Sequence, residues 1–468
     1  MSPPFDYDLV CIGSGPAGQR AAVQAAKLGK RVAVIEKQRV VGGVCIETGT
    51  IPSKTFREAV RTFSVRTQEG GPRVRPTMQQ LVQRVAEVVQ LEVDVVQDQL
   101  SRNDVQLIRG HAAFVDAHSL SVESEAGRST LSAEHILIAV GTRPSEPGSV
   151  KPDGRTVILS DSIVELEKLP RNMVVVGGGI IGIEYASMFA ALGVHVTVVD
   201  KRPRPLEFID QEIVDELVHQ LRQTNVTLRG GDAVESIEIS PGPPRSGVIR
   251  LESGKHLVAE VVLFSVGRTG ATDNLNLAAV GLTADDRGRL KVDDHLRTSV
   301  PHVYAAGDVI GYPALAATSS EQGRLAACHM FGLEVEPMAA HFPIGVYAIP
   351  EISMVGATEE ELTRAKVPYE TGIARFREIA RGQILGDDSG MFKMIFHRED
   401  RRLLGVHCIG TGATELIHIG QAVIGLGGGL DYFLRTVFNY PTLAECYKVA
   451  ALHAANKLHH AAAARQGL

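Results

Sequence analysis

The chain has 468 residues, of which 44% are hydrophobic and 22% are charged, and its formal net charge is -6. A chain of this length exceeds a single hydrophobic core, so we expect two or three domains of a globular protein. The charge balance and the lack of a long basic run exclude an ordinary nucleic-acid-binding surface, and no apolar run approaches the length of a membrane span. The N-terminus lacks the basic and apolar regions of a secretory signal, which predicts a cytoplasmic protein.

A βαβ unit is predicted at the start of the chain. Residues 7–12 form a short apolar run, an Ala-rich helical pattern follows to Leu28, and residues 31–35 form a second apolar run. Between the first run and the helix stands Gly13-Ser14-Gly15-Pro16-Ala17-Gly18, which has the spacing of the dinucleotide-binding loop. A Gly-rich turn alone would be weak evidence, but the two flanking strands make nucleotide binding the better interpretation.

Each residue of this first loop has an expected role. Gly13 allows the tight turn, Gly15 lets the backbone approach a pyrophosphate, and Gly18 lets the helix pack closely on the strand. The helix N-terminus offers unpaired N–H groups to the phosphates. Glu36, at the end of the second strand, is predicted to accept hydrogen bonds from an adenosine ribose.

A Gly-rich loop, residues 42–49, leads into a helix that is predicted to open at residues 51–54. The loop contains Cys45, and Thr50 stands just before the helix. The five cysteines of the chain form no CxxC pair, which argues against a disulfide framework or a zinc site and fits a reducing compartment. Cys45 could be a weakly reactive thiol, but we favour a small packing residue.

The sequence pattern over residues 76–155 predicts one or two helices, then a strand, then a linker. Residues 76–102 have apolar positions at helical spacing, which predicts one or two long helices with a packing role. An apolar strand at residues 136–140 enters a turn at Gly141. Residues 145–155 are rich in Pro, Gly and charge, and they are predicted to form a linker.

A second copy of the dinucleotide pattern begins at Met173. A short apolar run leads into Gly177-Gly178-Gly179-Ile180-Ile181-Gly182, a helical pattern and the strand 196–199. Asp200 stands as far from the first glycine of its loop as Glu36 stands from Gly13. Two such units predict that two dinucleotides bind. The residues expected to hold the second one are Gly177, Gly179, Gly182 and Asp200.

The turn after Asp200 carries basic residues, Lys201, Arg202 and Arg204. Asp200 can accept hydrogen bonds from the ribose of NAD but would repel the 2′-phosphate of NADP. The basic residues can offset that repulsion or bind the phosphate. A solvated basic turn is the plain alternative, but its place at the specificity position favours binding of both nucleotides.

The chain then returns to the first domain. A strand from residue 261 ends at Gly267-Arg268, and an apolar strand near residues 303–306 enters a turn at Gly307 and Asp308, followed by an Ala-rich helix. A solvated Gly-Asp loop is the alternative for that turn. From about Phe342 the pattern changes to alternating strands, followed by two predicted helices and a mobile tail after Leu458.

Residues 42–54, GGVCIETGTIPSK, resemble the redox loop of the flavoprotein disulfide reductases, such as lipoamide dehydrogenase and glutathione reductase. The turns at Gly141 and at Gly307-Asp308 resemble the flavin-binding motifs of that family. The resemblance covers essentially the whole chain. It implies an α/β fold in which two Rossmann-like domains precede a C-terminal α+β domain that forms a homodimer or a higher oligomer. The implied division is an FAD domain at 1–150, an NAD(P) domain at 151–268, a return to the FAD domain at 269–341 and a dimerisation domain at 342–468.

The chain departs from the family pattern at two positions. The family motif is GG-x-C-x(4)-C-x-PSK, and Thr50 stands where the second cysteine of the redox pair belongs. Tyr440 stands where the family has a proton-handling histidine supplied by the partner subunit, while Glu445 keeps the glutamate that orients it. The family resemblance also implies that Lys54 lies near the flavin N5 edge with Glu184 beside it.

These departures predict a flavoprotein that reduces no thiol substrate. Hydride transfer needs a nicotinamide held against FAD with water excluded, but no acid or base at carbon. The expected activity is reversible hydride transfer between NADPH and NAD⁺, with FAD as cofactor, NAD and NADP as alternating substrates, and ping-pong kinetics. An NAD(P)H:quinone or dye reductase is the close alternative, and a non-catalytic nucleotide-binding partner is a more distant one. No metal site is predicted.

Overall fold

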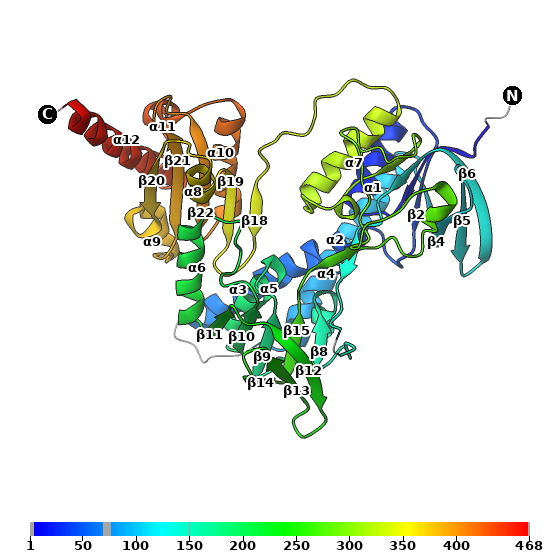
Figure 1. Cartoon of the computed structure of the whole chain (residues 1–468), viewed down its shortest axis with the longest axis horizontal. Helices are drawn as coiled ribbons and strands as arrows, with labels where there is room; N and C mark the ends of the chain where they lie inside the picture. The colour runs from blue at the N-terminus through cyan, green and yellow to red at the C-terminus, as the bar shows by residue number, and fades with distance from the viewer. Residues whose placement is uncertain (1–3, 69–75, 149, 467–468) are drawn as a thin grey trace.

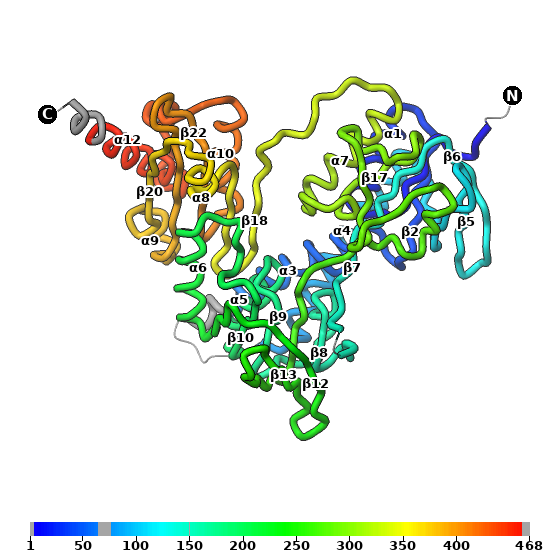
Figure 2. Tube along the Cα trace, in the orientation of Figure 1, coloured from blue at the N-terminus to red at the C-terminus, as the bar shows by residue number. Residues whose placement is uncertain are grey.

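The computed structural model describes residues 4–68, 76–148 and 150–466 of the chain. Three lobes are visible in Figure 1, with the first domain, the second domain and the C-terminal domain arranged around helices α3 (Thr50–Gln68) and α4 (Met78–Ser101). The chain from the first domain to the C-terminal domain can be followed in Figure 2. The predicted α/β class with two Rossmann-like domains and a C-terminal α+β domain is confirmed.

The first domain is built on one sheet whose central strands are parallel. Its elements are β1 (Tyr7–Ile12), β2 (Val32–Glu36), β3 (Gln106–Arg109), β4 (His111–Phe114), β5 (Ser119–Ser124), β6 (Gly127–Ile138), β17 (Val303–Ala305), α1 (Pro16–Lys27) and α7 (Ala316–Met330). The strand order is β3-β2-β1-β6-β5-β4, and β17 pairs with β6. Strand β1 runs parallel to both β2 and β6, and β17 runs parallel to β6. The return segment therefore completes the sheet that the N-terminal βαβ unit begins, and helix α7 packs against α1.

The second domain repeats this plan on a smaller sheet. Its elements are β8 (Val157–Leu159), η1 (Ser160–Glu165), β9 (Asn172–Val176), α5 (Ile180–Ala191), β10 (His195–Asp200), α6 (Gln211–Gln223), β11 (Val226–Gly230), β12 (Val234–Ser240), β13 (Ser246–Leu251), β14 (His256–Ala259) and β15 (Val261–Phe264). The parallel order is β11-β10-β9-β15-β8, and β12-β13-β14 form a separate antiparallel sheet. Both predicted βαβ units are therefore present.

A two-stranded ribbon marks the crossing between these domains. Strand β7 (Thr142–Pro144) leaves the first domain, β16 (Arg268–Gly270) returns to it, and the two pair antiparallel. Between β7 and residue 156 the described residues form no helix or strand, as expected of a linker. The boundaries proposed at 150, 268 and 341 stay predictions.

Long helices follow the Gly-rich loop. The prediction of a loop over residues 42–49 was wrong in part, because residues 43–47 form a short helix, α2 (Gly43–Glu47), before α3. The stretch 76–102 contains the single helix α4. Thr77 begins α4 with a capping box, in which its side chain accepts from Gln80 N and Gln80 Oε1 accepts from Thr77 N. Helix α3 also joins the first two domains, because Phe56 packs against Phe189 of α5 with ring centroids 5.8 Å apart.

The C-terminal domain is an antiparallel sheet covered by helices. Its elements are β18 (Ile344–Val346), β19 (Ile352–Gly356), α8 (Glu359–Arg364), β20 (Tyr369–Arg375), α9 (Ala380–Leu385), β21 (Met391–His397), β22 (Leu403–Ile409), α10 (Ala413–Gly425), α11 (Leu430–Arg435) and α12 (Glu445–Gln466). The order is β18-β19-β22-β21-β20. The expectation of two final helices was wrong, since three follow β22 in the described chain. Helix α11 is short and was missed, and α12 continues beyond Leu458, where a tail was predicted.

Candidate functional site

A large cavity lies where the first two domains meet and reaches the C-terminal domain. Its volume is ≈ 1940 Å³, and both glycine loops line it, together with Lys54, Glu184 and Tyr347. The parallel strands β1 and β9 each end at one of these loops, so the fold brings both nucleotide-binding edges to one space. A cavity of this size has room for large ligands.

The first glycine loop has the geometry that a pyrophosphate requires. Gly13 has φ +107°, and a Cβ there would overlap the carbonyl oxygen of Ala139. A Cβ at Gly18 would overlap the carbonyl oxygen of Gly13, so the helix packs directly on the turn. At Gly15, by contrast, a Cβ would meet nothing within 4 Å, and this residue lines the cavity as the N-cap of α1. The free N–H groups of α1 therefore face open space, as expected for phosphate binding.

Glu36 ends β2 at the edge of this loop and is only 4% exposed. Its Oε2 accepts hydrogen bonds from Ser14 N at 3.0 Å and Ser14 Oγ at 2.5 Å, and its Oε1 accepts from Gln38 N at 2.8 Å. Ser14 Oγ also accepts a hydrogen bond from Gly42 N at 2.9 Å, which joins the start of the 42–49 segment to the first glycine loop. Glu36 lines the cavity, and its predicted contact with a ribose stays a prediction.

The second glycine loop repeats the first in detail. Gly177 has φ +109°, and a Cβ there would lie 2.6 Å from the carbonyl oxygen of Ser265. A Cβ at Gly182 would overlap the carbonyl oxygen of Gly177, while one at Gly179 would meet nothing within 4 Å. Gly179 is the N-cap of α5 and lines the cavity. The chain thus presents two helix N-termini to the same space.

The basic turn, residues 201–204, is organised around Asp200. Arg202 forms an ion pair with the Asp200 carboxylate, with Nη2–Oδ2 at 2.6 Å and Nε–Oδ1 at 3.0 Å. Burial acts to raise the pKa of Asp200, but the hydrogen bonds from Arg202 and Gly178 outweigh it and the pKa is lowered. Lys201 and Arg202 line the cavity, whereas Arg204 pairs with Asp215 of α6 at 3.0 Å and is not among the lining residues.

Lys54 and Glu184 meet in the cavity wall, although they come from α3 and α5. Lys54 Nζ lies 3.0 Å from Glu184 Oε1 and 2.9 Å from Oε2. The Glu184 side chain is 3% exposed and the Lys54 side chain 26% exposed. Glu184 Oε1 also accepts from Tyr347 N at 2.8 Å, and Lys54 Nζ lies 5.0 Å from the Tyr347 ring centroid. All three domains therefore contribute to this ion pair.

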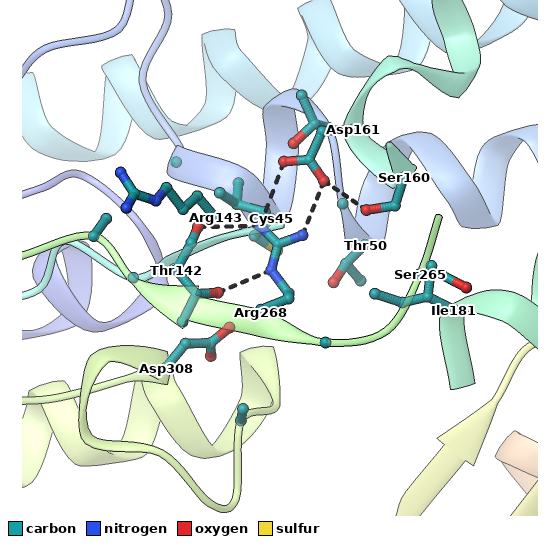
Figure 3. Close-up of a pocket in the computed structure, with 18 of the residues that line it drawn as sticks. Cys45, Thr50, Thr142, Arg143, Ser160, Asp161, Ile181, Ser265, Arg268 and Asp308 are labelled. Atoms are coloured by element: carbon teal, nitrogen blue, oxygen red, sulfur yellow. Dashed lines mark hydrogen bonds and ion pairs between the residues drawn. The ribbon is translucent and has the colours of Figure 1, made fainter. Parts of the chain in front are cut away.

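Arg268 crosses the junction of the first two domains, as Figure 3 shows. Its Nη1 lies 2.9 Å from Asp161 Oδ1 of η1, and its Nε donates to Thr142 Oγ1 at 2.9 Å. Asp308 lies below Thr142 in the same view, and burial raises the pKa of this carboxyl. Gly141, Gly267 and Gly307 line the cavity with φ angles of +64°, +125° and +83°.

Comparisons with known proteins agree with this geometry. The family model described as pyridine nucleotide-disulphide oxidoreductase matches residues 7–323, and the model of its dimerisation domain matches residues 342–451. The chain belongs to this family.

Curated relatives and solved structures cover nearly the whole of this family member. A protein of Mycobacterium tuberculosis (strain ATCC 25177 / H37Ra) named soluble pyridine nucleotide transhydrogenase is 53% identical over 97% of this chain and 98% of the relative. The protein of the same name from Photobacterium profundum is 45% identical over 97% and 98%. The crystal structure of LpdA from Mycobacterium tuberculosis matches with a TM-score of 0.88 and 26% identity, over 95% of this chain and 99% of that one. The HOCl-induced flavoprotein disulfide reductase RclA from Escherichia coli matches with a TM-score of 0.86 and 28% identity, over the same shares.

FAD is the cofactor of this family, and the first loop fits it. Gly15 leaves the space in front of α1 open, and both the buried carboxylate of Glu36 and the partly buried carboxylate of Asp308 line the cavity. Glu36, the α1 N-terminus and Asp308 are the groups that would hold the ribose, the pyrophosphate and the ribityl chain. The assignment of these residues stays a prediction.

The redox loop of this family member has one thiol. Burial raises the pKa of the Cys45 thiol, and a hydrogen bond with the Thr50 side chain opposes that rise. Cys45 and Thr50 both line the cavity, at the places where the family pattern has its cysteine pair, and both are labelled in Figure 3. All five cysteines of the chain are free. A hydroxyl in place of the second thiol cannot close a disulfide.

Tyr440 and Glu445 lie in the dimerisation domain, away from the cavity of their own chain. Neither is among the lining residues, and Tyr440 is 67% exposed. Glu445 begins α12, and its Oε2 is buried without a hydrogen-bond partner. Val437 is 91% exposed beside Tyr440. An exposed apolar surface of this kind suits the contact between subunits that the dimerisation domain forms.

Several site residues had no predictive signal in the sequence. Asp161 and Tyr347 act through partners far away in the chain, so no local spacing marks them, and Ser14 lies in the predicted first loop but had no role assigned to it. For Arg268 the sequence predicts only the end of a strand, although its place after Gly267 is a signal for a role at the domain crossing. Among the described residues no helix is both long enough and apolar enough to span a membrane.

Proposed function

We propose that this chain is a cytoplasmic, FAD-dependent NAD(P)⁺ transhydrogenase that moves hydride reversibly between NADPH and NAD⁺. The observation that carries the proposal is the pairing of Cys45 with Thr50 in a cavity that keeps both dinucleotide loops. The nucleotide sites are intact, while the thiol relay that would serve a disulfide substrate is missing. The relatives' name, soluble pyridine nucleotide transhydrogenase, supports the same activity.

The residues of the chain bind and orient the reactants. The N-terminus of α5, opened by Gly179, takes the pyrophosphate of the incoming nicotinamide nucleotide. When bound, FAD supplies an acceptor and donor of hydride between successive nucleotides. Lys54, held in place by Glu184, presents a cation at the cavity wall, which favours negative charge there. The cavity has a volume of ≈ 1940 Å³ between the domains, so FAD and a nicotinamide nucleotide bound there would displace water from the reacting groups.

The site geometry also supports alternation of the two substrates. The described chain holds one nicotinamide-type loop, at 177–182, because the other loop belongs to the FAD domain. NADPH and NAD⁺ then bind one after the other at the same place. The free cysteines suit a reducing compartment, which supports the cytoplasmic assignment.

The experiment is an anaerobic assay of the FAD-loaded protein with NADPH and thio-NAD⁺, both varied. We expect parallel reciprocal plots, because the first product leaves before the second substrate binds. A second measurement follows flavin absorbance after mixing with NADPH and then with a quinone. Rapid reoxidation by the quinone without turnover of thio-NAD⁺ would contradict the proposal in favour of a quinone reductase.

A further inference from the structure

The carboxylate of Asp200 has no acceptor position left for a nucleotide. An ionised carboxylate offers about four lone-pair sites. Oδ2 accepts from Gly178 N at 2.5 Å and Arg202 Nη2 at 2.6 Å, and Oδ1 accepts from Arg202 N at 2.8 Å and Arg202 Nε at 3.0 Å. Those four bonds match the capacity of the group. A ribose hydroxyl can therefore bind Asp200 only if one of these donors leaves.

The four donors differ in how easily they can leave. The N–H groups of Gly178 and Arg202 belong to the backbone of the loop and the turn, so they stay in place. The other two donors belong to the Arg202 side chain, which is 39% exposed and lines the cavity. After the guanidinium moves, the two backbone N–H groups still solvate the carboxylate, which is 10% exposed. The side chain can therefore move without leaving Asp200 unpaired.

We propose that the Arg202 side chain is an exchangeable cap on Asp200 that lets one site accept both nucleotides. When NAD(H) binds, its ribose hydroxyls replace the guanidinium on Asp200. When NADP(H) binds, the guanidinium leaves Asp200 and binds the 2′-phosphate with its planar fork of donors. This inference rests on the proposed function, because only a chain that uses both nucleotides needs such an exchange.

The neighbouring basic residues are less suited to this role. Arg204 is paired with Asp215 outside the lining of the cavity. Lys201 is exposed and carries a point charge without a fork. Arg202, by contrast, lines the cavity and also binds the Asp200 carboxylate, the group expected to select NAD. The matched control is therefore Arg204→Gln, which removes a guanidinium from the same turn.

The test measures binding of two adenosine fragments to the FAD-loaded protein by isothermal titration calorimetry. The fragments are 2′,5′-ADP, which carries the 2′-phosphate, and 5′-AMP, which carries free ribose hydroxyls. We expect Arg202→Gln to weaken 2′,5′-ADP by about tenfold, the effect of one charge-assisted hydrogen bond. Binding of 5′-AMP should become tighter or stay unchanged, because Asp200 is uncapped. Arg204→Gln should change either affinity by less than about twofold.

Arg202 could instead stay on Asp200 and only neutralise its charge. To distinguish this static role from phosphate binding, Arg202→Gln is repeated in a protein that already carries Asp200→Asn. If Arg202 only neutralises Asp200, its loss has no further effect once that charge is gone. If it binds the phosphate, Arg202→Gln still weakens 2′,5′-ADP by at least about fivefold on this background. A smaller loss, or weaker binding of 5′-AMP to Arg202→Gln, would overturn the proposal. Fragment binding does not depend on turnover, so failure of the transhydrogenase assay is a separate outcome.

Discussion

At the scale of single residues, the ion pair of Lys54 and Glu184 is unevenly buried. Glu184 is 3% exposed, whereas Lys54 is 26% exposed and can reach water. Loss of the lysine would leave a buried carboxylate with one remaining donor, the Tyr347 N–H. Loss of the carboxylate would leave a cation that solvent can still reach. The two halves of one pair therefore differ in how costly they are to remove.

We expect Lys54→Met to destabilise the protein by about 2–3 kcal/mol and Glu184→Gln by about 1 kcal/mol. Urea unfolding followed by far-UV circular dichroism measures both, since the chain has no tryptophan to report by fluorescence. The double variant Lys54→Met, Glu184→Gln is the control, and it should recover most of the loss seen with Lys54→Met. Equal stability of the two single variants would contradict the uneven burial of the pair.

At the scale of elements, the two glycines of helix α5 do different work. Gly182 lets the helix contact the turn at Gly177, whereas Gly179 leaves the space in front of the helix open. We expect Gly182→Ala to lower the stability by about 1–3 kcal/mol, because its methyl group has no room. Gly179→Ala has no clash and a φ of -79°, so it should keep the melting temperature of the native protein.

The KM values complete this comparison. Gly179→Ala should raise KM for NADH and NADPH alike by about tenfold, because the methyl group occupies the space of the pyrophosphate that both share. Melting is followed by circular dichroism and KM by flavin-linked turnover. Unchanged KM values for Gly179→Ala would show that the second loop does not bind the phosphates, and a fall in its melting temperature would show that the added methyl group has no free space.

The sequence predicted these elements well because their signals are local. A strand, three glycines at fixed spacing and an acid at the next strand end lie within one short segment, so Glu36 and Asp200 were found without a structure. Contacts between distant segments left no such signal. The hydrogen bond from Tyr347 to Glu184 joins two domains, and the ion pair of Arg202 with Asp200 depends on side-chain conformation. Short helices such as α11 also escape, because six residues carry little periodicity.

At the scale of the whole molecule, a buried lysine joins the second domain to the dimerisation domain. Lys393 of β21 is 1% exposed, and its Nζ lies 2.8 Å from Asp210 Oδ1 and 3.0 Å from Glu212 Oε2. It also pairs with Glu359 of α8. Burial alone would lower the pKa of Lys393, but Asp210 and the other carboxylates raise it. The ammonium thus holds together carboxylates that would otherwise repel one another.

We expect Lys393→Met to destabilise the protein by about 3–5 kcal/mol, because the fully buried Asp210 loses its cation. Arg84→Met is the matched control, since Arg84 and Glu87 form an ion pair with side chains 60% and 51% exposed. That variant should lose less than about 1 kcal/mol. Urea unfolding of both variants measures these losses of stability. A similar loss of stability for the two variants would show that the buried cluster does not hold the domains together.

The β7–β16 ribbon has a consequence for the history of the molecule. Because the chain leaves and re-enters the first domain on adjacent strands, the two ends of the inserted segment lie about 4.8 Å apart. An insert with neighbouring ends places almost no constraint on the host, so a dinucleotide module can be gained or exchanged in one genetic event. A new module would have to match the contacts that the second domain makes with its neighbours, such as those of Phe189 with Phe56, Glu184 with Lys54 and Asp210 with Lys393. The two nucleotide-binding domains of this protein can therefore have different evolutionary origins.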